Sequence, residues 1–168
     1  MLKDMHPAKI VVLGMGNPLL QDDGVGVHLV HTLNTDELEC PNLEIIDAGT
    51  SPEIASLIEG ADKLIIIDAV KGGKEPGTIY RFSLDDVQEV DLDSPVRLSL
   101  HQVGVIDNLR MLKLLEKCPR KIIIIGVEPQ SIGWGLEPSP KIKERLAELK
   151  RVVIQEIRDG MPHSISQK

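Results

Sequence analysis

Four polar residues of this sequence have types and positions that suit hydrolytic or metal chemistry. Asp47 and Asp68 each follow an apolar run directly, in the segments IIDAGT and IIIDAV, and Asp23 lies in the segment after the first apolar run. His101 opens a helix-period segment ahead of the last apolar run. In an open, mostly parallel sheet, ligands bind beyond the carboxyl ends of the strands. We therefore expect these three carboxylates at one edge of a sheet, with His101 leaning over the same edge.

A divalent metal ion accounts for this combination of side chains. Two carboxylates and one neutral imidazole balance a doubly positive ion and offer the oxygen and nitrogen donors that suit nickel or zinc, with coordination positions left for water or substrate. A helix N-terminus favours the neutral form of His101, which is the form that binds metal. The sequence contains no local motif such as H-E-x-x-H. The spacing alone therefore leaves the metal site a hypothesis.

Each of these residues also has a structural interpretation. Residues 22–24 fit a turn and a helix cap, with Asp23 as the N-cap, and Asp47 and Asp68 fit caps of helices that follow their strands. His101 also fits a solvated surface histidine, and Glu128 fits a loop charge better than a site carboxylate. The other histidines have no comparable context, and we expect them to be structural or solvated: His6, His28, His31 and His163.

Charge and composition exclude several classes of function. The 168 residues suit one domain, 42% of them are apolar, and 19 basic against 26 acidic residues give a net charge of −7. That charge, together with the scarcity of aromatic residues, argues against nucleic-acid binding. Gly14-x-Gly16 resembles the start of a dinucleotide fingerprint, but Leu19 replaces its third glycine and two nearby carboxylates would repel a phosphate. Trp134, between two glycines, fits either an exposed contact residue or a loop anchor.

Sequence features also indicate a compartment. The apolar runs are far shorter than the roughly 20 residues that span a bilayer, and the N-terminus lacks the apolar stretch of a secretory signal. Cys40 and Cys118 stand apart, without a neighbouring cysteine, which is typical of free thiols in a reducing compartment. We therefore expect a cytoplasmic protein that binds neither membranes nor nucleic acid.

Apolar runs alternate with helix-period segments, an order typical of a layered α/β domain. We expect a single domain over residues 1–168, with an ordered core of about residues 9–158 and a frayed tail at residues 160–168. Ser139-Pro140 supplies an N-cap and a proline at the first position of the last helix. The predicted strands are residues 9–13, 43–46, 64–67, 78–83 and 121–127, the predicted helices are residues 24–34, 52–59, 101–117 and the segment from 140 onward, and residues 84–97 are expected to form an acidic loop.

Six phrases of the sequence occur in an order that resembles one protein family. They cover roughly residues 9–157 and run VVLGMGNPLLQDDGVG, IIDAGT, LIIIDAV with the later PGT, SLHQVG, IIIIGVEPQS and GLEPSPKIKE. The family is that of the hydrogenase maturation endopeptidases, which trim the C-terminal extension of the large subunit of nickel–iron hydrogenases. One such phrase would be weak support, but six in family order are highly specific. Pro138 departs from the pattern, which places an aliphatic residue before Ser139-Pro140.

The resemblance implies a fold and a set of site residues. The fold is a three-layer α/β/α domain of the phosphorylase/hydrolase-like kind, around a twisted, mostly parallel five-stranded sheet in which residues 78–83 form the one antiparallel strand. The family's metal ligands fall on Asp23, Asp68 and His101, and Asp47 matches an aspartate implicated in activity. The metal is nickel presented by the substrate, although zinc or cadmium suits the same donors.

The implied reaction is endopeptidase removal of the extension from the hydrogenase large-subunit precursor after nickel insertion, by a monomeric enzyme. Two mechanisms stay open. In one, the metal polarises the scissile carbonyl or lowers the pKa of a bound water, while a carboxylate such as Asp47 handles protons. In the other, two of the aspartates Asp23, Asp47 and Asp68 act as an acid pair of the aspartic-peptidase type, without metal-activated water.

Two other functions fit part of the sequence. A peptidyl-tRNA hydrolase opens with a similar strand and GxGNP turn, but that family continues with an Asn-His pair and a basic surface, where this chain has Asp22-Asp23 and a net charge of −7. A nickel-binding chaperone would sense the loaded large subunit without cutting it. The chaperone differs from the protease only in leaving the mass of the precursor unchanged.

Overall fold

Five strands form the central sheet of the computed structural model, which describes residues 7–86 and 100–161, with only the backbone described for residues 100–102. The order across the sheet is β2-β1-β3-β5-β4, and β4 alone of these strands runs antiparallel to its neighbour. The strand bounds are β1 (Ile10–Met15), β2 (Leu43–Gly49), β3 (Lys63–Ala69), β4 (Ile79–Ser83) and β5 (Lys121–Val127). The mostly parallel sheet, with its antiparallel strand near residues 78–83, is confirmed.

The sequences of the central strands explain their position. β3 reads KLIIIDA and β5 reads KIIIIGV, and nearly every residue of both is buried. Branched aliphatic side chains favour the extended backbone, and an unbroken apolar run suits a parallel strand that is covered on both faces. Polar residues enter these strands only at their first residues and near their carboxyl ends, where the candidate acid Asp68 stands.

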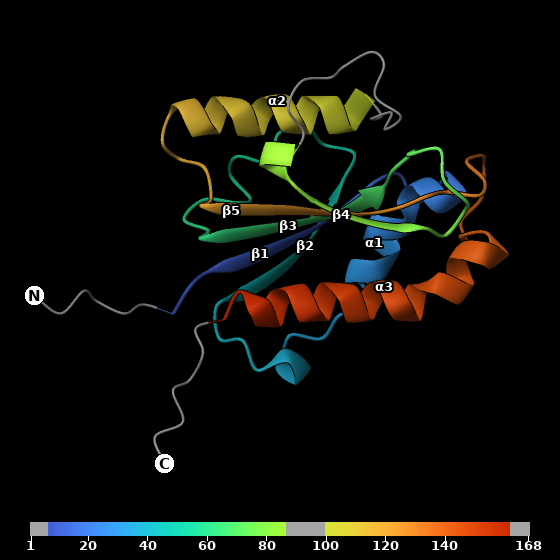
Figure 1. Cartoon of the computed structure of the whole chain (residues 1–168), viewed down its shortest axis with the longest axis horizontal. Helices are drawn as coiled ribbons and strands as arrows, with labels where there is room; N and C mark the ends of the chain where they lie inside the picture. Colours follow the sequence, from blue (N-terminus) through green and yellow to red (C-terminus); the bar gives the residue numbers. More distant parts are fainter. Residues whose placement is uncertain (1–6, 87–99, 162–168) are drawn as a thin grey trace, which may run out of the picture.

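Helices cover both faces of the sheet, which gives the three-layer α/β/α arrangement (Figure 1). The helices α1 (Val25–Val30) and α3 (Pro140–Asp159) lie on one face, and α2 (Leu100–Leu114) lies on the other. Because side chains alternate along a strand, Ile65 and Ile67 of β3 pack with α1 and α3, whereas Ile66 packs with α2. This alternation decides which layer each candidate acid faces.

Two predicted helices differ from the structure. In place of a helix over residues 24–34, a 3₁₀ turn, η1 (Gln21–Gly24), leads into α1. Helix α1 ends early because the N–H and the hydroxyl of Thr32 both donate to the carbonyl of Leu29. Residues 52–59 form turns, because the apolar spacing of Ile54 and Ile58 spans one helical turn, too little to nucleate a helix.

The remaining predictions concern the chain around α2 and α3. Helix α2 agrees with the prediction for residues 101–117, and α3 begins at Pro140 after Ser139, as expected. Of the acidic stretch at residues 84–97, only η3 (Leu84–Asp86) lies within the described residues, and most of the predicted tail lies outside them. Among the helices of residues 7–86 and 100–161, none has the length and apolar character needed to cross a bilayer.

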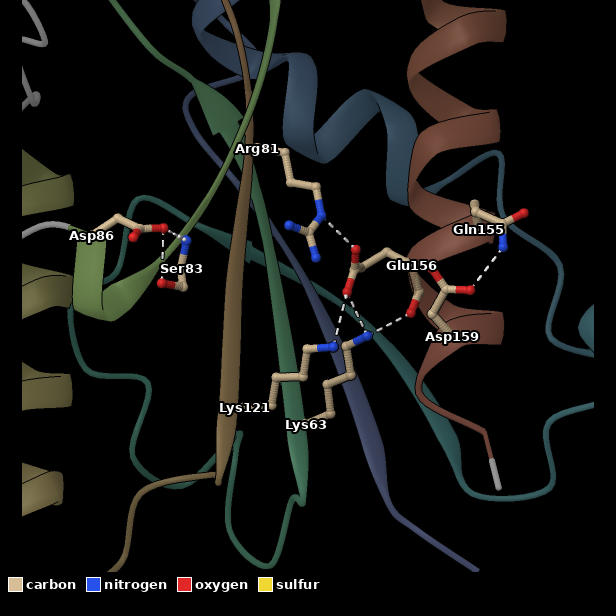
Figure 2. Close-up of polar contacts among 8 residues, drawn as sticks. All are labelled: Lys63, Arg81, Ser83, Asp86, Lys121, Gln155, Glu156 and Asp159. Atoms are coloured by element: carbon tan, nitrogen blue, oxygen red, sulfur yellow. Dashed lines mark hydrogen bonds and ion pairs between the residues drawn. The ribbon is translucent and has the colours of Figure 1, made fainter. Parts of the chain in front are cut away.

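A group of charges centred on the buried pair Lys63 and Glu156 joins α3 to the amino ends of β3 and β5 and to β4 (Figure 2). The Nζ of Lys63, the first residue of β3, donates to the Oε1 atom and to the backbone carbonyl of Glu156, both at 2.6 Å. The Nε of Arg81 on β4 donates to the other carboxylate oxygen at 2.7 Å, and the Nζ of Lys121 lies 3.8 Å from Oε1. These charges therefore fix one layer to the sheet at the end away from the candidate site.

Candidate active site

Asp22 and Asp23 are neighbours in η1 but have different surroundings, and Asp22 has a structural role. Asp22 is 0% exposed. Its Oδ2 accepts hydrogen bonds from the backbone N–H groups of Gln130 and Ser131 at 2.9 and 2.8 Å and from the hydroxyl of Ser139 at 2.7 Å, and its Oδ1 accepts from the N–H of Ser139 at 2.6 Å. Four donors occupy this carboxylate, so Asp22 ties η1 to the segment between β5 and α3.

The same contacts change the role of Ser139. It occupies the N-cap position of α3, as predicted, but its hydroxyl makes no capping bond and donates to Asp22 instead. Proline at the first position of α3 lacks an N–H, which reduces the number of backbone donors that a cap must satisfy. The serine side chain is therefore free to hold the Asp22 carboxylate.

Asp23 is half-buried and has a lighter set of partners. Its Oδ2 accepts the backbone N–H of Asn17 at 2.9 Å. It does not cap α1, whose N-cap is Gly24 without a side-chain bond, so the capping interpretation is wrong. Gly16, with a φ of +116°, allows η1 to approach the end of β1, because a Cβ there would lie 1.8 Å from the carbonyl oxygen of Asp23. The glycine thus places the Asp23 backbone against the carboxyl end of β1.

Asp68 stands near the carboxyl end of β3, opposite Gly126 of β5, and is 2% exposed. Its Oδ1 accepts the adjacent N–H of Ala69 at 2.8 Å, and it does not cap a following helix. It lines a small pocket on the α2 side of the sheet, whose other lining residues are apolar: Met15, Ile66, Val70, Phe82, Val105, Ile106 and Ile124. Asp68 thus places a buried carboxylate at the carboxyl edge of the sheet, beneath residues of α2, where open parallel sheets bind their ligands.

His101 is the second residue of α2, and its side chain lies outside the described part of the structure. Its position is one helical turn before Val105, which lines the Asp68 pocket. Among the described side chains, no group of three His, Cys, Asp or Glu residues stands close enough to hold a metal ion. The predicted set of Asp23, Asp68 and His101 is not covered by that observation, because His101 is not among those side chains.

Asp47 lies on β2 opposite Gly14 and contacts a histidine that the sequence did not single out. Its Oδ2 lies 2.9 Å from the Nε2 of His31, just past the end of α1, and its Oδ1 accepts the N–H of Gly49 at 3.1 Å. It too caps no helix. His31 is solvent-exposed, as predicted, but it has this partner because the short α1 brings its end beside β2. Nothing in the spacing of residues 31 and 47 signals the contact.

Asp47 and Asp68 face different layers at the same edge of the sheet. The side chains of Asp47 and Ile45, two residues apart on β2, point to the same face of the sheet, and Ile45 packs on the side of α1 and α3. The side chains of Asp68 and Ile66 on β3 likewise point to one face, and Ile66 packs on the side of α2. Asp68 therefore opens into the pocket under α2, whereas Asp47 meets His31 from α1. A substrate that meets both acids must therefore lie across this edge of the sheet.

Glu128 is a structural anchor, which corrects its interpretation as a solvated loop charge. It is buried, and its Oε2 accepts the N–H of Gly72 at 2.7 Å and the hydroxyl of Tyr80 at 2.5 Å. Burial and the adjacent Glu128 carboxylate raise the pKa of Tyr80 from 10 to about 12. The pair fastens the loop after β3 to β4.

We expect Glu128→Gln to lower the pKa of Tyr80, because the substitution removes the negative charge beside the hydroxyl. Tyr80 is the one tyrosine of the sequence, so the ultraviolet absorbance of tyrosinate reports it alone. The folded chain should titrate near 12 and the denatured chain near 10. The contribution of this bond to stability is then complete below about pH 10 and is lost as the pH rises through about 12. An unchanged midpoint in the variant would show that Glu128 does not affect the hydroxyl.

The fold and these acids define a small three-layer α/β domain with carboxylates at the carboxyl edge of its sheet, an arrangement typical of enzymes. The chain belongs to the hydrogenase maturation protease family, whose sequence model matches residues 27–156. Its relatives in that family are endopeptidases, a class of hydrolase.

Individual relatives agree with this assignment. The hydrogenase expression/formation protein HupD of Bradyrhizobium diazoefficiens is 33% identical over 141 residues, which cover 83% of this chain and 72% of that protein. The hydrogenase 2 maturation protease of Escherichia coli is 29% identical over 162 residues, 95% of this chain and 97% of that protein. The solved structure of the hydrogenase maturating endopeptidase HybD from E. coli has a TM-score of 0.75 and 28% identity, and covers 90% of this chain and 93% of that one. HupD of Thiocapsa roseopersicina is longer, and the chain spans 62% of its length.

Proposed function

We propose that this chain removes the C-terminal extension of a nickel–iron hydrogenase large-subunit precursor after nickel insertion, and that it recognises the inserted nickel through Asp23, Asp68 and His101. The observation that carries the proposal is the buried Asp68 carboxylate at the end of β3, which lines a pocket beside the start of α2. Asp23 is supported by its lighter hydrogen bonding compared with Asp22. Two carboxylates and an imidazole suit nickel, and also zinc or cadmium.

The residues of this chain divide the work of hydrolysis. A metal ion held by the precursor supplies Lewis-acid polarisation of a carbonyl or a bound water. Asp23 and Asp68 orient the precursor against the edge of the sheet. Asp47 takes the proton of the attacking water and returns it to the leaving amine. The Nε2 atom of His31 lies 2.9 Å from the Oδ2 atom of Asp47 and orients that side chain.

We further propose that the enzyme acts as a monomer in the cytoplasm. Support for the compartment comes from Cys40 and Cys118, which are both free thiols in the structure. Cytoplasmic conditions keep such thiols reduced. Burial raises the pKa of the Cys118 thiol, which lowers its reactivity at neutral pH.

Precursor mass provides the direct test. The purified chain is incubated with nickel-loaded and with nickel-free large-subunit precursor, and the mass of the precursor is followed over time. Loss of the extension from the loaded sample only is the expected result. Binding of the loaded precursor without any change of mass would instead support a nickel-sensing chaperone, and equal cleavage of both samples would remove nickel from the proposal.

Asp22→Asn and Asp23→Asn should have opposite effects, the first mainly on stability and the second mainly on cleavage. In Asp22→Asn, an NH2 group replaces one of the two acceptor oxygens, so at least one of the four donors loses its acceptor and the free energy of unfolding should fall by about 2 kcal/mol. Asp23→Asn loses a carboxylate oxygen at a half-buried position that accepts a backbone N–H from Asn17, so stability should change little while cleavage falls steeply. Urea unfolding and the precursor assay measure the two effects. A stable, inactive Asp22→Asn protein would reverse the assignment of the two acids.

A further inference from the structure

Four exposed apolar side chains stand beside η1, on two segments that lie together. They come from the loop after β1 and from the segment between β5 and α3, and we call them the Trp134 surface: Leu19, Ile132, Trp134 and Leu136. Trp134 is 85% exposed. In Figure 1 the segment that follows β5, in orange, lies at the end of the molecule where α1 begins. Groups of exposed large apolar side chains mark interaction sites.

Backbone hydrogen bonds hold the two segments in register. The N–H of Gly135 donates to the carbonyl of Leu19 at 2.9 Å, and the N–H of Gln21 donates to the carbonyl of Gly135 at 3.0 Å. The hydroxyl of Ser131 donates to the side chain of Gln21 at 2.7 Å. The buried Asp22 carboxylate then clamps the segment at both ends. A surface fixed in this way loses little conformational entropy when it binds.

The Trp134 surface is continuous with the candidate site. The N–H of Leu19 donates to the side-chain carbonyl of Asn17 at 2.9 Å, and the N–H of Asn17 donates to the Asp23 carboxylate. A protein that brings a metal ion to Asp23 therefore also covers Leu19 and the segment paired with it. The fold itself gains nothing from exposing Trp134, since the core closes without it.

We infer that the Trp134 surface docks an apolar patch on the folded body of the hydrogenase large-subunit precursor, while the edge of the sheet beside Asp23 receives the segment to be cut. This inference rests on the proposed function. An extended peptide binds in a groove or along a strand edge, where pockets take alternate side chains. Trp134 and Leu136 instead protrude into solvent, which suits insertion into a shallow hollow of a folded partner. Tryptophan is also among the residues that most often dominate binding energy at interfaces.

The first test separates docking from chemistry. Trp134→Ser combined with Leu136→Ser should raise the KM for the nickel-loaded precursor by about 30-fold and leave kcat unchanged. The matched control is Leu114→Ser combined with Leu115→Ser, at the end of α2 on the far side of the molecule, where Leu114 is also 85% exposed. The control should match the unmodified chain. Equal KM values for the two double variants would overturn the inference and leave the proposed protease function intact.

The second test identifies what the surface touches. Trp134 is the one tryptophan of the chain, so fluorotryptophan incorporated into this chain gives a single fluorine resonance. Mature large subunit without the extension, and nickel-free precursor, should both shift this resonance and protect it from a soluble paramagnetic quencher. A synthetic peptide of the extension should do neither. Protection by the peptide alone would assign the surface to the extension and overturn the inference.

Two further outcomes are distinguishable from these. If the precursor protects Trp134 but is never cut, docking stands and the protease proposal fails. Sedimentation of the free chain tests for a second copy on this surface, and a monomer is expected. A dimer that the Trp134→Ser, Leu136→Ser variant dissociates would show that the surface belongs to self-association, which contradicts the inference.

Discussion

Asp68→Asn is expected to lower kcat/KM for a nickel-loaded precursor at least about 100-fold, because the substitution removes a buried anionic oxygen from the candidate site. The side chain keeps its shape and lies in an otherwise apolar pocket, so the fold should tolerate the change. We expect the thermal midpoint to move by about 4 °C or less, which corresponds to about 1 kcal/mol for a chain of this size. Cleavage is measured by precursor mass and stability by thermal unfolding.

The control for this prediction is Glu128→Gln. Glu128 is also a buried carboxylate just beyond the end of a central strand, but its bonds go to Gly72 and Tyr80 within the fold. Losing its charge should leave the cleavage rate close to that of the unmodified chain. Comparable losses of activity in both variants would indicate a general effect of removing buried charge, and normal cleavage by Asp68→Asn would exclude Asp68 as a ligand.

The strands were predictable because their signal is local. Runs such as KIIIIGV favour extended backbone and burial at once, so propensity and tertiary packing agree and β5 has the predicted bounds. The helices near residues 24–34 and 52–59 were less predictable because their extent depends on single contacts. Thr32 ends α1 through its bonds to Leu29, and turns that bury Ile54 replace the second helix.

The positions of the site residues were predictable only where they follow directly from the end of a strand. Asp68 follows from the end of β3, but its separation from Asp47 depends on which face each strand position takes. The role of Asp22 depends on donors from residues 130–139, more than 100 positions away, which no spacing rule reveals. The partners of Glu128 and the contact of His31 with Asp47 are likewise set by the assembled layers.

The buried charges at the other end of the sheet should have the largest effect on stability. Glu156→Ala leaves the Nζ of Lys63, which is 3% exposed as a residue, with only a backbone carbonyl as partner. Removing one member of a buried ion pair costs about 3–5 kcal/mol, because the other charge stays buried without compensation. The thermal midpoint should fall by about 10 °C. Glu148→Ala is the matched control on the same helix, since Glu148 pairs with Arg145 at the surface, and it should cost less than about 1 kcal/mol.

The pH dependence of this stabilisation follows from the lowered pKa of Glu156. Burial alone would raise the pKa of Glu156, but the hydrogen bonds from Arg81 and Lys63 hold it below its ordinary value. A carboxyl whose pKa is lowered by folding contributes stability above its unfolded pKa and loses that contribution as the pH falls through the folded value. The gap in unfolding free energy between the unmodified chain and Glu156→Gln should therefore be widest near neutral pH and narrow below about pH 4.

Lys63→Met combined with Glu156→Leu should recover most of the stability that Glu156→Ala loses, because neither charge is then left buried alone. If Glu156→Ala costs no more than Glu148→Ala in urea unfolding, the cluster in Figure 2 does not hold α3 to the sheet.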